Sequence, residues 1–251
     1  NRDISVVLCG PAKTLEGLVG DKKERIEIID APQIITNHEQ PTMALRKKPD
    51  SSLATALRLL KEKKVDAFVG AGSTGALLAG GIFVVGRIRG VERPALGILM
   101  PTVKDKPVLL MDCGANVDCK PRYLQQFAVM STVYMETVVK VKNPSVRLLN
   151  IGAEEEKGNE LTKAAYELLK GSCENFAGNI EARELLEGDT DIVVCDGFDG
   201  NLILKNTEGL AVAMMQMMKK EFLSDFRSKL GAMLLKPALR RFKKRLDYTE
   251  Y

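Results

Sequence analysis

Four segments of this 251-residue chain combine glycines with polar side chains directly after an apolar run. The first, residues 71–77, has a flexible backbone at Gly72 and Gly75 and hydroxyl groups at Ser73 and Thr74. Glycine lets the backbone approach a ligand closely, and a hydroxyl-capped helix start directs free N–H groups outward, which together suit an anion. The segment lacks both the Walker A pattern and strict Gly-x-Gly-x-x-Gly spacing, so a strand-to-helix turn with a good N-cap explains it equally well.

Residues 113–118 form a second such segment, after an apolar run that ends in Asp112. Asn116 can donate a hydrogen bond to a carbonyl or phosphate oxygen, and Asp112 can position a donor or bind a cation. A turn whose Asn and Asp side chains satisfy their own backbone is the alternative. The pattern recurs in residues 196–201, where two Asp-Gly dipeptides precede Asn201, although a hairpin turn has the same signature.

Lys157 lies in residues 152–159, after the apolar run 146–151 and just before a predicted helix start. A lysine there can meet an anion, and the three preceding glutamates can hold it or favour the helix N-terminus. A solvated charge run is the alternative. Because ligands of open parallel sheets bind beyond the carboxyl ends of the strands, the four segments together predict a cleft for an anionic, phosphate-bearing ligand.

The elements that must position these segments alternate between apolar runs and helical patterns. The runs are continuous stretches of Val, Ile and Leu, which are typical of strands buried on both faces. An α/β fold with a mostly parallel, doubly wound sheet is therefore predicted, with helices on both sides. The predicted strands span residues 4–9, 25–30, 66–70, 95–100, 107–113, 146–151 and 191–195. The predicted helices span residues 51–64, 121–141 (capped near Asp118), 159–170 and 202–222, and another starts at Ser73.

Composition excludes several classes of protein. Hydrophobic residues make up 45% of the chain and its net charge is +4, which excludes an intrinsically disordered chain. No stretch approaches the ~18 uncharged apolar residues of a membrane-spanning helix, and we expect no signal peptide. The single histidine, His38, and five cysteines without a Cys-x-x-Cys pair argue against Ser-His-Asp chemistry and zinc. We therefore expect reduced, mostly buried thiols, no metal and no cofactor.

The C-terminal segment is basic and amphipathic. Residues 219–245 contain ten Lys or Arg and two acids, a net charge of +8, whereas the rest of the chain carries −4. Gly231 and Pro237 predict a break into two helices, which gives a helical hairpin over residues 219–247 beside a catalytic core over residues 1–218. The hairpin suits an anionic membrane surface, an acidic carrier protein or a dimer interface, and nucleic acid is disfavoured because no nucleic-acid module accompanies the charge. The expected membrane or partner contacts are Phe226, Leu230, Met233, Leu234 and Lys236.

Several segments also match, in order, the motifs of one enzyme family. They are residues 46–52, 71–76, 86–96, 114–118 with Pro121, 150–160, 178–183, and 196–201 with 204–205 and 208–209. On these motifs the chain resembles the bacterial phosphate acyltransferases of phospholipid synthesis. The fold of that family is similar to those of phosphotransacetylases and of isocitrate and isopropylmalate dehydrogenases. Compared with the family, the chain is expected to lack a glycine-rich N-terminal loop and a stretch beyond Tyr251.

The resemblance implies an acyltransferase that moves a fatty acyl group from acyl-acyl-carrier protein to inorganic phosphate and gives acyl-phosphate. It also implies a cytoplasmic homodimer that associates peripherally with the inner face of the bacterial membrane. The alternatives are a short-chain phosphotransacetylase that uses coenzyme A and a non-catalytic membrane-surface scaffold. The basic hairpin argues against the first, and the four polar segments argue against the second. An NAD-linked dehydrogenase shares the architecture, but no dinucleotide loop is legible.

Phosphate attack on a thioester depends on positioned donors and cations rather than on a covalent enzyme intermediate. We therefore expect Lys157 to bind phosphate or the developing oxyanion, and Asn116 and Asn201 to complete the catalytic group. Asp196 and Asp199 are expected to orient the cations. The expected substrate-binding residues are Arg46, Gly72, Ser73, Thr74, Gly75, Asp196, Asp199 and Lys205.

Overall fold

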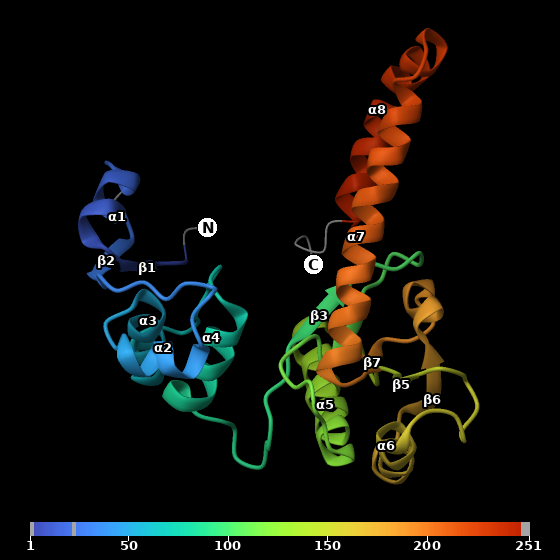
Figure 1. The fold of residues 1–251 in the computed structure, drawn as a ribbon, viewed down its shortest axis with the longest axis horizontal. Helices are drawn as coiled ribbons and strands as arrows, with labels where there is room; N and C mark the ends of the chain where they lie inside the picture. Colours follow the sequence, from blue (N-terminus) through green and yellow to red (C-terminus); the bar gives the residue numbers. More distant parts are fainter. Residues whose placement is uncertain (1–2, 22–23, 247–251) are drawn as a thin grey trace. The chain divides into compact units, whose positions relative to one another are not determined.

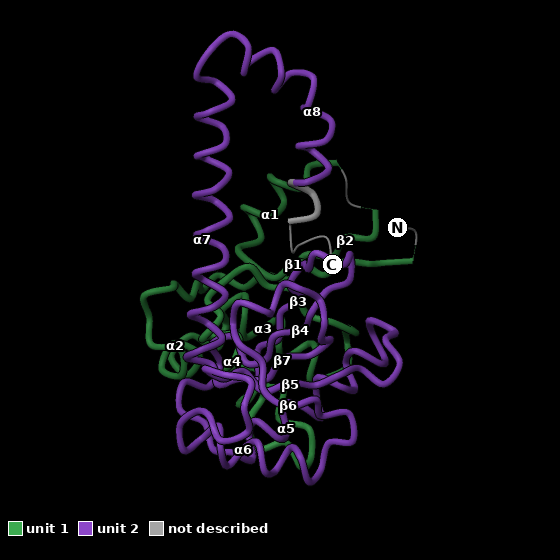
Figure 2. Tube along the Cα trace, turned by 90° about the vertical axis from the view of Figure 1, so that its right-hand side faces the viewer, with its two compact units in different colours: residues 1–94 green, residues 95–251 purple. Residues whose placement is uncertain are grey.

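The computed structural model describes residues 3–21 and 24–246. The chain forms two compact units, Asn1–Pro94 and Ala95–Tyr251, which we call the N-terminal and the C-terminal unit (Figure 2). The expected boundary at residue 218 differs from this division. Residue 218 lies within a long helix, α7 (Gly197–Phe222), which begins just after a strand of the C-terminal unit (Figure 1).

The described part of the N-terminal unit combines a parallel strand pair with short helices. Strands β1 and β2 pair in register from Val6↔Ile26 to Gly10↔Asp30. Pro41 takes the first position of one helix, and the Ser51 hydroxyl accepts a hydrogen bond from the Ala54 N–H (3.3 Å) to cap another. The elements are β1 (Val6–Gly10), α1 (Ala12–Val19), β2 (Ile26–Asp30), α2 (Pro41–Lys47), α3 (Ser52–Lys61), α4 (Thr74–Gly80) and the π-helical turn η1 (Gly81–Val85).

The prediction of a strand over residues 66–70 is wrong. The structure has irregular backbone there, and the Val69 side chain is 95% exposed. An apolar run forms a stable strand only when a neighbouring strand pairs with its N–H and C=O groups. In the described part of the N-terminal unit no strand pairs with these residues, so local β propensity alone does not produce a strand.

The C-terminal unit contains a five-stranded sheet in the order β3-β4-β7-β5-β6. Strand β3 is antiparallel to β4, and the other neighbours run parallel. The expectation of a mostly parallel sheet is therefore confirmed. Strand β6 was not predicted, because its sequence Phe-Ala-Gly-Asn-Ile-Glu is not a continuous apolar run. The strands are β3 (Gly97–Met100), β4 (Val108–Met111), β5 (Val146–Asn150), β6 (Phe176–Glu181) and β7 (Ile192–Val194).

Helices cover both faces of this sheet, and each face has its own core. One core packs Leu148 and Val194 of the sheet against Phe127 of α5 and Leu169 of α6. The other core contains the alternate strand residues, such as Val193, with Leu185 of the 3-10 helix η3. The helices are α5 (Pro121–Tyr134) with its π-helical continuation η2 (Met135–Val139), α6 (Glu160–Ser172), η3 (Ala182–Glu187) and α7 (Gly197–Phe222). Helix α5 has Lys120 at its N-cap with no side-chain cap, so Asp118 does not cap it as expected.

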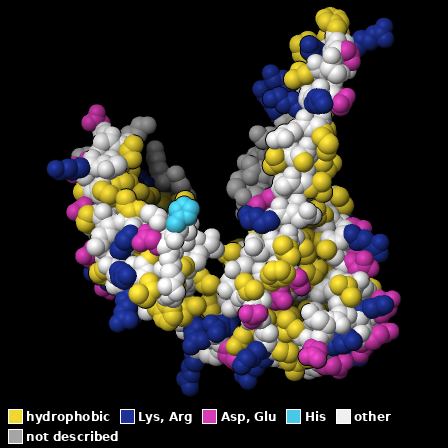
Figure 3. All heavy atoms as spheres, in the orientation of Figure 1, with side chains coloured by type: hydrophobic (Ala, Val, Ile, Leu, Met, Phe, Trp, Pro, Cys, Tyr) yellow, Lys and Arg dark blue, Asp and Glu magenta, His cyan; other side chains and the backbone are white. Residues whose placement is uncertain are grey.

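A helical hairpin extends from the C-terminal unit. Helix α7 has 26 residues, and α8 (Phe226–Leu246) folds back along it (Figures 1 and 2). The predicted break at Gly231 and Pro237 is wrong, because α8 runs through both. The chain reverses instead just before α8, where the Asp225 carboxylate accepts hydrogen bonds from the N–H (2.9 Å) and hydroxyl (2.8 Å) of Ser228. Hydrophobic and basic side chains gather along the hairpin (Figure 3).

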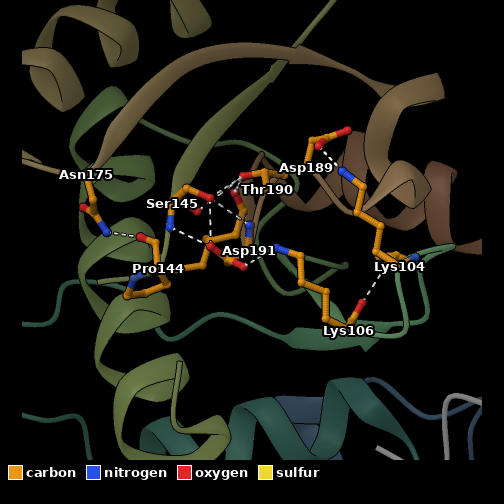
Figure 4. Close-up of polar contacts among 10 residues, drawn as sticks. Lys104, Lys106, Pro144, Ser145, Asn175, Asp189, Thr190 and Asp191 are labelled. Atoms are coloured by element: carbon orange, nitrogen blue, oxygen red, sulfur yellow. Dashed lines mark hydrogen bonds and ion pairs between the residues drawn. The ribbon is translucent and has the colours of Figure 1, made fainter. Parts of the chain in front are cut away.

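The amino ends of the parallel strands are joined by a network of polar contacts (Figure 4). The Asp191 carboxylate, which precedes β7, accepts hydrogen bonds from Lys106 Nζ (2.9 Å) and from the Ser145 N–H and hydroxyl (2.9 Å each). Lys106 precedes β4 and Ser145 precedes β5, so one carboxylate ties three strand starts together. Burial opposes ionisation of Asp191, but its hydrogen bonds to Lys106 and Ser145 outweigh this effect and lower its pKa.

We predict that Asp191→Asn lowers the free energy of unfolding by about 2 kcal/mol at pH 7, because it breaks charge-assisted hydrogen bonds. The lowered pKa means that the ionised Asp191 contributes stability above the pKa of an unfolded aspartate, about 4, and that this contribution is lost as the pH falls through the folded pKa. Urea unfolding at pH 7 and at pH 3 measures both effects. The difference between variant and parent should shrink at pH 3.

Asp189→Asn is the matched control. Asp189 lies two residues away and pairs with Lys104, but its side chain is 61% exposed. Exposed ion pairs contribute little, so this variant should stay within about 0.5 kcal/mol of the parent. Equal losses in the two variants would show that the Asp191 network has no special role.

Candidate active site

The expected polar segments of the C-terminal unit follow neighbouring strands at one edge of the sheet. Strands β4, β7 and β5 are adjacent and parallel, so residues 112–118, 195–201 and 151–159 all begin at their carboxyl edge. This arrangement is the one expected for ligand sites in open α/β sheets.

The loop after β4 is organised by Asp112, whose side chain is fully buried. Its Oδ1 accepts hydrogen bonds from the N–H groups of Leu96 (3.0 Å), Gly114 (3.2 Å) and Ala115 (3.0 Å). Its Oδ2 accepts from the backbone N–H and the side-chain Nδ2 of Asn116, both at 2.8 Å. Asn116, an expected catalytic residue, therefore has its amide oriented by this carboxylate.

Residues 196–201 are not the loop that was expected, because they cap and begin α7. The Asp196 carboxylate accepts a hydrogen bond from the Asp199 N–H (2.8 Å), and the Gly197 N–H donates to the Asn116 carbonyl (2.8 Å). Partial burial and then the charge of Asp196 raise the pKa of Asp199. Asn201 lies in the second turn of α7, beside Gly114.

Two glycines let the first turn of α7 approach the loop after β4 so closely that backbone packs directly against backbone. A Cβ atom on Gly200 would lie 1.9 Å from the carbonyl oxygen of Asp112. A Cβ atom on Gly197 would lie 2.7 Å from the carbonyl oxygen of Asn116. Both contacts are with backbone, which cannot swing aside as a flexible side chain can. The close approach joins Asn116, Asp196 and the first turns of α7 into one rigid group.

Lys157 lies on the loop after β5, and other residues hold that loop in place. The Asn150 side chain donates to the Lys157 carbonyl (3.0 Å), and the buried Asn179 side chain donates to the Glu154 carbonyl (2.7 Å). Glu155 does not hold Lys157 as expected, because it pairs with Lys170 (2.7 Å), which lowers the pKa of Glu155. Within the described part of the chain, the Lys157 Nζ has no hydrogen-bond or ion-pair partner.

Lys205 has an ion-pair partner of its own, and the remaining expected substrate-binding residues belong to the N-terminal unit. Lys205 forms an ion pair with Glu208 (2.9 Å) one turn further along α7. Arg46, Gly72, Ser73, Thr74 and Gly75 belong to the N-terminal unit. There, the Ser73 hydroxyl caps α4 by accepting from the Ala76 N–H (3.3 Å), as the sequence predicted, and Arg46 is exposed in the last turn of α2.

The described residues offer neither a thiolate nucleophile nor a metal cluster. Burial, and then the charge of Asp112, raises the pKa of Cys113 to about 12. Burial, and then Asp196, raises the pKa of Cys119 to about 11. No group of three or more His, Cys, Asp or Glu in residues 3–21 and 24–246 is arranged to hold a metal ion. The side chains at this edge therefore offer hydrogen-bond donors, carboxylates and the lysine cation.

Fold comparison places the chain among phosphotransacylase-like α/β proteins. A phosphotransacetylase from Streptococcus pyogenes superposes with a TM-score of 0.56 at 13% identity, over 83% of this chain and 82% of that one. A branched-chain phosphotransacylase from Enterococcus faecalis gives a TM-score of 0.53 at 15% identity, over 82% and 84%. These likenesses establish the fold, in agreement with the expected phosphotransacetylase-like architecture.

Sequence comparison then places the chain in one family. Residues 1–251 match the family of fatty acid synthesis proteins, and the chain belongs to it. The chain is 52% identical to proteins named phosphate acyltransferase from Clostridium acetobutylicum and from Alkaliphilus oremlandii, over the whole of this chain and 76% of each relative. A relative of the same name from Clostridium novyi is 50% identical. Within residues 3–21 and 24–246, no helix is both long enough and apolar enough to span a membrane.

We predict that Gly200→Ala destabilises the protein by about 1–3 kcal/mol, the usual range for overpacking, because its Cβ atom would collide with the Asp112 carbonyl. Gly209→Ala is the matched control on the same helix. Gly209 is exposed and a Cβ atom there would meet nothing within 4 Å, so alanine should stabilise by about 0.5–1 kcal/mol through helix propensity. Thermal unfolding distinguishes them, and equal shifts would contradict the close approach.

Proposed function

We propose that the chain is a phosphate acyltransferase that transfers a fatty acyl group from acyl-acyl-carrier protein to inorganic phosphate. The observation that carries this proposal is the 52% identity, over the whole chain, to proteins named phosphate acyltransferase. The carboxyl edge of the sheet supports it chemically, since it combines amide donors with a lysine cation that has no partner among the described residues.

The proposed reaction needs no covalent enzyme intermediate. An oxygen of hydrogenphosphate attacks the thioester carbonyl carbon, a C–O bond forms, and the C–S bond breaks as the tetrahedral oxyanion collapses. The thiolate leaves and takes up the proton that hydrogenphosphate gives up, so the products are acyl-phosphate and a free thiol. Two anions, the phosphate and the developing oxyanion, must be brought together, and a preorganised cation and donors supply most of the stabilisation.

In this proposal Lys157 neutralises the phosphate or the oxyanion. Its loop is fixed by Asn150 and Asn179, while its Nζ has no competing partner among the described residues. Asn116 and Asn201 are proposed to supply amides to the same substrate, and Asp196 and Asp199 to orient the donors around them. The argument for substrate binding is weakest for Lys205, because Lys205 already forms an ion pair with Glu208. The residues of the N-terminal unit, Arg46 and the segment 72–75, are proposed to contact the substrate.

The test is the release of carrier-protein thiol from palmitoyl-acyl-carrier protein, with and without phosphate, and hydroxylamine trapping of the acyl-phosphate. We predict that Lys157→Gln lowers kcat/KM for phosphate about 100-fold, the usual cost of one preorganised group. Lys163→Gln is the matched control, since Lys163 is exposed on the adjacent helix α6, and it should stay within about twofold of the parent.

Four results would overturn parts of this proposal. Phosphate-independent release would contradict the reaction, and full activity of Lys157→Gln would contradict the assigned residue. Turnover of acetyl-coenzyme A but not of the acylated carrier protein would favour the short-chain phosphotransacetylase. Absence of turnover with both donors would favour a non-catalytic scaffold.

We further propose that the hairpin formed by α8 and the end of α7 contacts the membrane peripherally and that the protein works at the cytoplasmic surface as a homodimer. Phe226, Met233 and Leu234 are 81%, 63% and 74% exposed, and apolar side chains recur every three or four residues along α8. Leu230 and Lys236 belong to the same surface. Exposed apolar side chains beside basic residues suit an anionic lipid surface.

We predict that Phe226→Ser combined with Leu234→Ser lowers binding to phosphatidylglycerol vesicles at least tenfold, because each apolar side chain contributes about 1.5 kcal/mol or more when buried. Leu18→Ser is the control, since Leu18 is 79% exposed in the N-terminal unit. Vesicle sedimentation measures the binding. If the double variant dissociates a dimer in light scattering and binds vesicles unchanged, the hairpin is a subunit interface and the membrane proposal is wrong.

A further inference from the structure

The carboxylate of Asp112 is buried without an ion-pair partner among the described residues. Its side chain is fully buried, and five N–H donors surround its two oxygens at 2.8–3.2 Å. Removing a carboxylate from water is costly unless such donors replace its hydration. Because its oxygens are already filled by donors from the protein itself, Asp112 is not the cation ligand that the sequence allowed.

The five donors come from different parts of the chain. Leu96 lies just before β3, Gly114 and Ala115 form the turn after β4, and Asn116 contributes both backbone and side chain. The carboxylate therefore turns the backbone N–H groups of this loop inward, toward itself. A ligand at this edge must then be bound by side chains rather than by the amides of residues 114–116.

The same residue also links the loop to α7. The Asp112 N–H donates to the carbonyl of Cys195, the residue directly after β7 (3.1 Å). The Asp112 carbonyl packs against Gly200, where a side chain would not fit. The Asn116 carbonyl in turn accepts the Gly197 N–H (2.8 Å) at the start of the helix. A shift of the Asp112 carboxylate would therefore move the Asn116 amide against the first turn of α7.

We propose that Asp112 is a positioning residue of the acyl-transfer site and that it acts through the side-chain amide of Asn116. This inference rests on the proposed function. Asp112 itself is buried and does not touch substrate, but it fixes the direction in which the Asn116 amide points. Reacting groups must be held within a fraction of an ångström, and a displacement of about 1 Å can cost about 100-fold in rate.

The test compares a buried carboxylate, Asp112, with a partly buried one, Asp191, at opposite ends of the same sheet. Asp112→Asn places an amide N–H against the Asn116 donors and so displaces the Asn116 side chain. It should therefore lower kcat for phosphate-dependent thiol release about 10- to 100-fold, although Asp112 itself does not contact the substrate. The KM for phosphate should change less than kcat. Asp191→Asn removes a comparable carboxylate at the amino edge, so it should lower the Tm and leave kcat within about twofold of the parent.

A double-mutant cycle separates positioning from stability. If Asp112 acts through Asn116, the double variant Asp112→Asn, Asn116→Leu should have a kcat no lower than the worse single variant. Multiplied losses would show that the two residues act independently and would overturn the proposal. If Asp112→Asn does not fold, Asn116→Leu still tests the premise, because it deletes the oriented amide and should lower kcat with the Tm within a few degrees of the parent. A folded Asn116→Leu variant with the kcat of the parent would overturn the proposal.

The outcomes also distinguish this inference from the proposed function. Absence of phosphate-dependent turnover in the parent protein would overturn the proposed function and this inference with it. An active parent whose Asp112→Asn variant keeps full kcat, or loses no more than Asp191→Asn does, would overturn the inference alone. Thermal unfolding of every variant, run beside the kinetics, ensures that rates are compared between folded proteins.

Discussion

The site of the C-terminal unit depends on the contact between two pieces of backbone, the loop after β4 and the first turn of α7. Gly197 and Gly200 leave no side chain between them, so the Asp112 carbonyl and the Asn116 carbonyl lie directly against the helix. This contact also explains why two Asp-Gly dipeptides, which have the signature of a turn, begin a helix instead. Asp196 supplies the cap, and the glycines supply the close approach.

The sheet places its network of ion pairs and its candidate site at opposite ends of the parallel strands. At the amino edge, Asp191 and Asp189 are paired with Lys106 and Lys104, so cations and anions neutralise each other (Figure 4). At the carboxyl edge, Asp112 is satisfied by N–H groups alone, and Lys157 is left without a partner among the described residues. The ion pairs at the amino edge can therefore stabilise the strand ends while the Lys157 cation at the carboxyl edge stays available to a ligand.

Much of the fold could be predicted from the sequence, because strands buried on both faces appear as continuous apolar runs. The same signal failed over residues 66–70, since pairing depends on a neighbouring strand that a local pattern does not reveal. It also missed β6, where Gly178 and Asn179 interrupt the run and pairing with β5 determines the conformation. Likewise, a proline inside α8 suggested a break, but the hairpin turn is set by the Asp225 cap.

The candidate site was only partly visible from the sequence. Topology alone carries Asn116, Lys157 and Asp196 to one edge, so the positions of strand ends were sufficient to select them. The pairing of Lys205 with Glu208 and the burial of Asp112 depend on side-chain directions and loop shape, which strand and helix patterns do not encode. Asp112 was visible as a strand-end aspartate, but five converging donors are needed to distinguish a positioning role from cation binding.

The burial of Asp112 and the exposure of the Lys157 cation at the carboxyl edge are connected. Because Asp112 draws the loop amides of residues 114–116 inward, the backbone after β4 cannot supply the positive potential that an anion requires. A side chain can supply that potential instead, and Lys157 lies on the loop after β5, which is separated from β4 by β7. Glu155, two residues before Lys157, is paired with Lys170 on α6 instead. An arriving anion therefore meets a lysine without first having to displace that carboxylate.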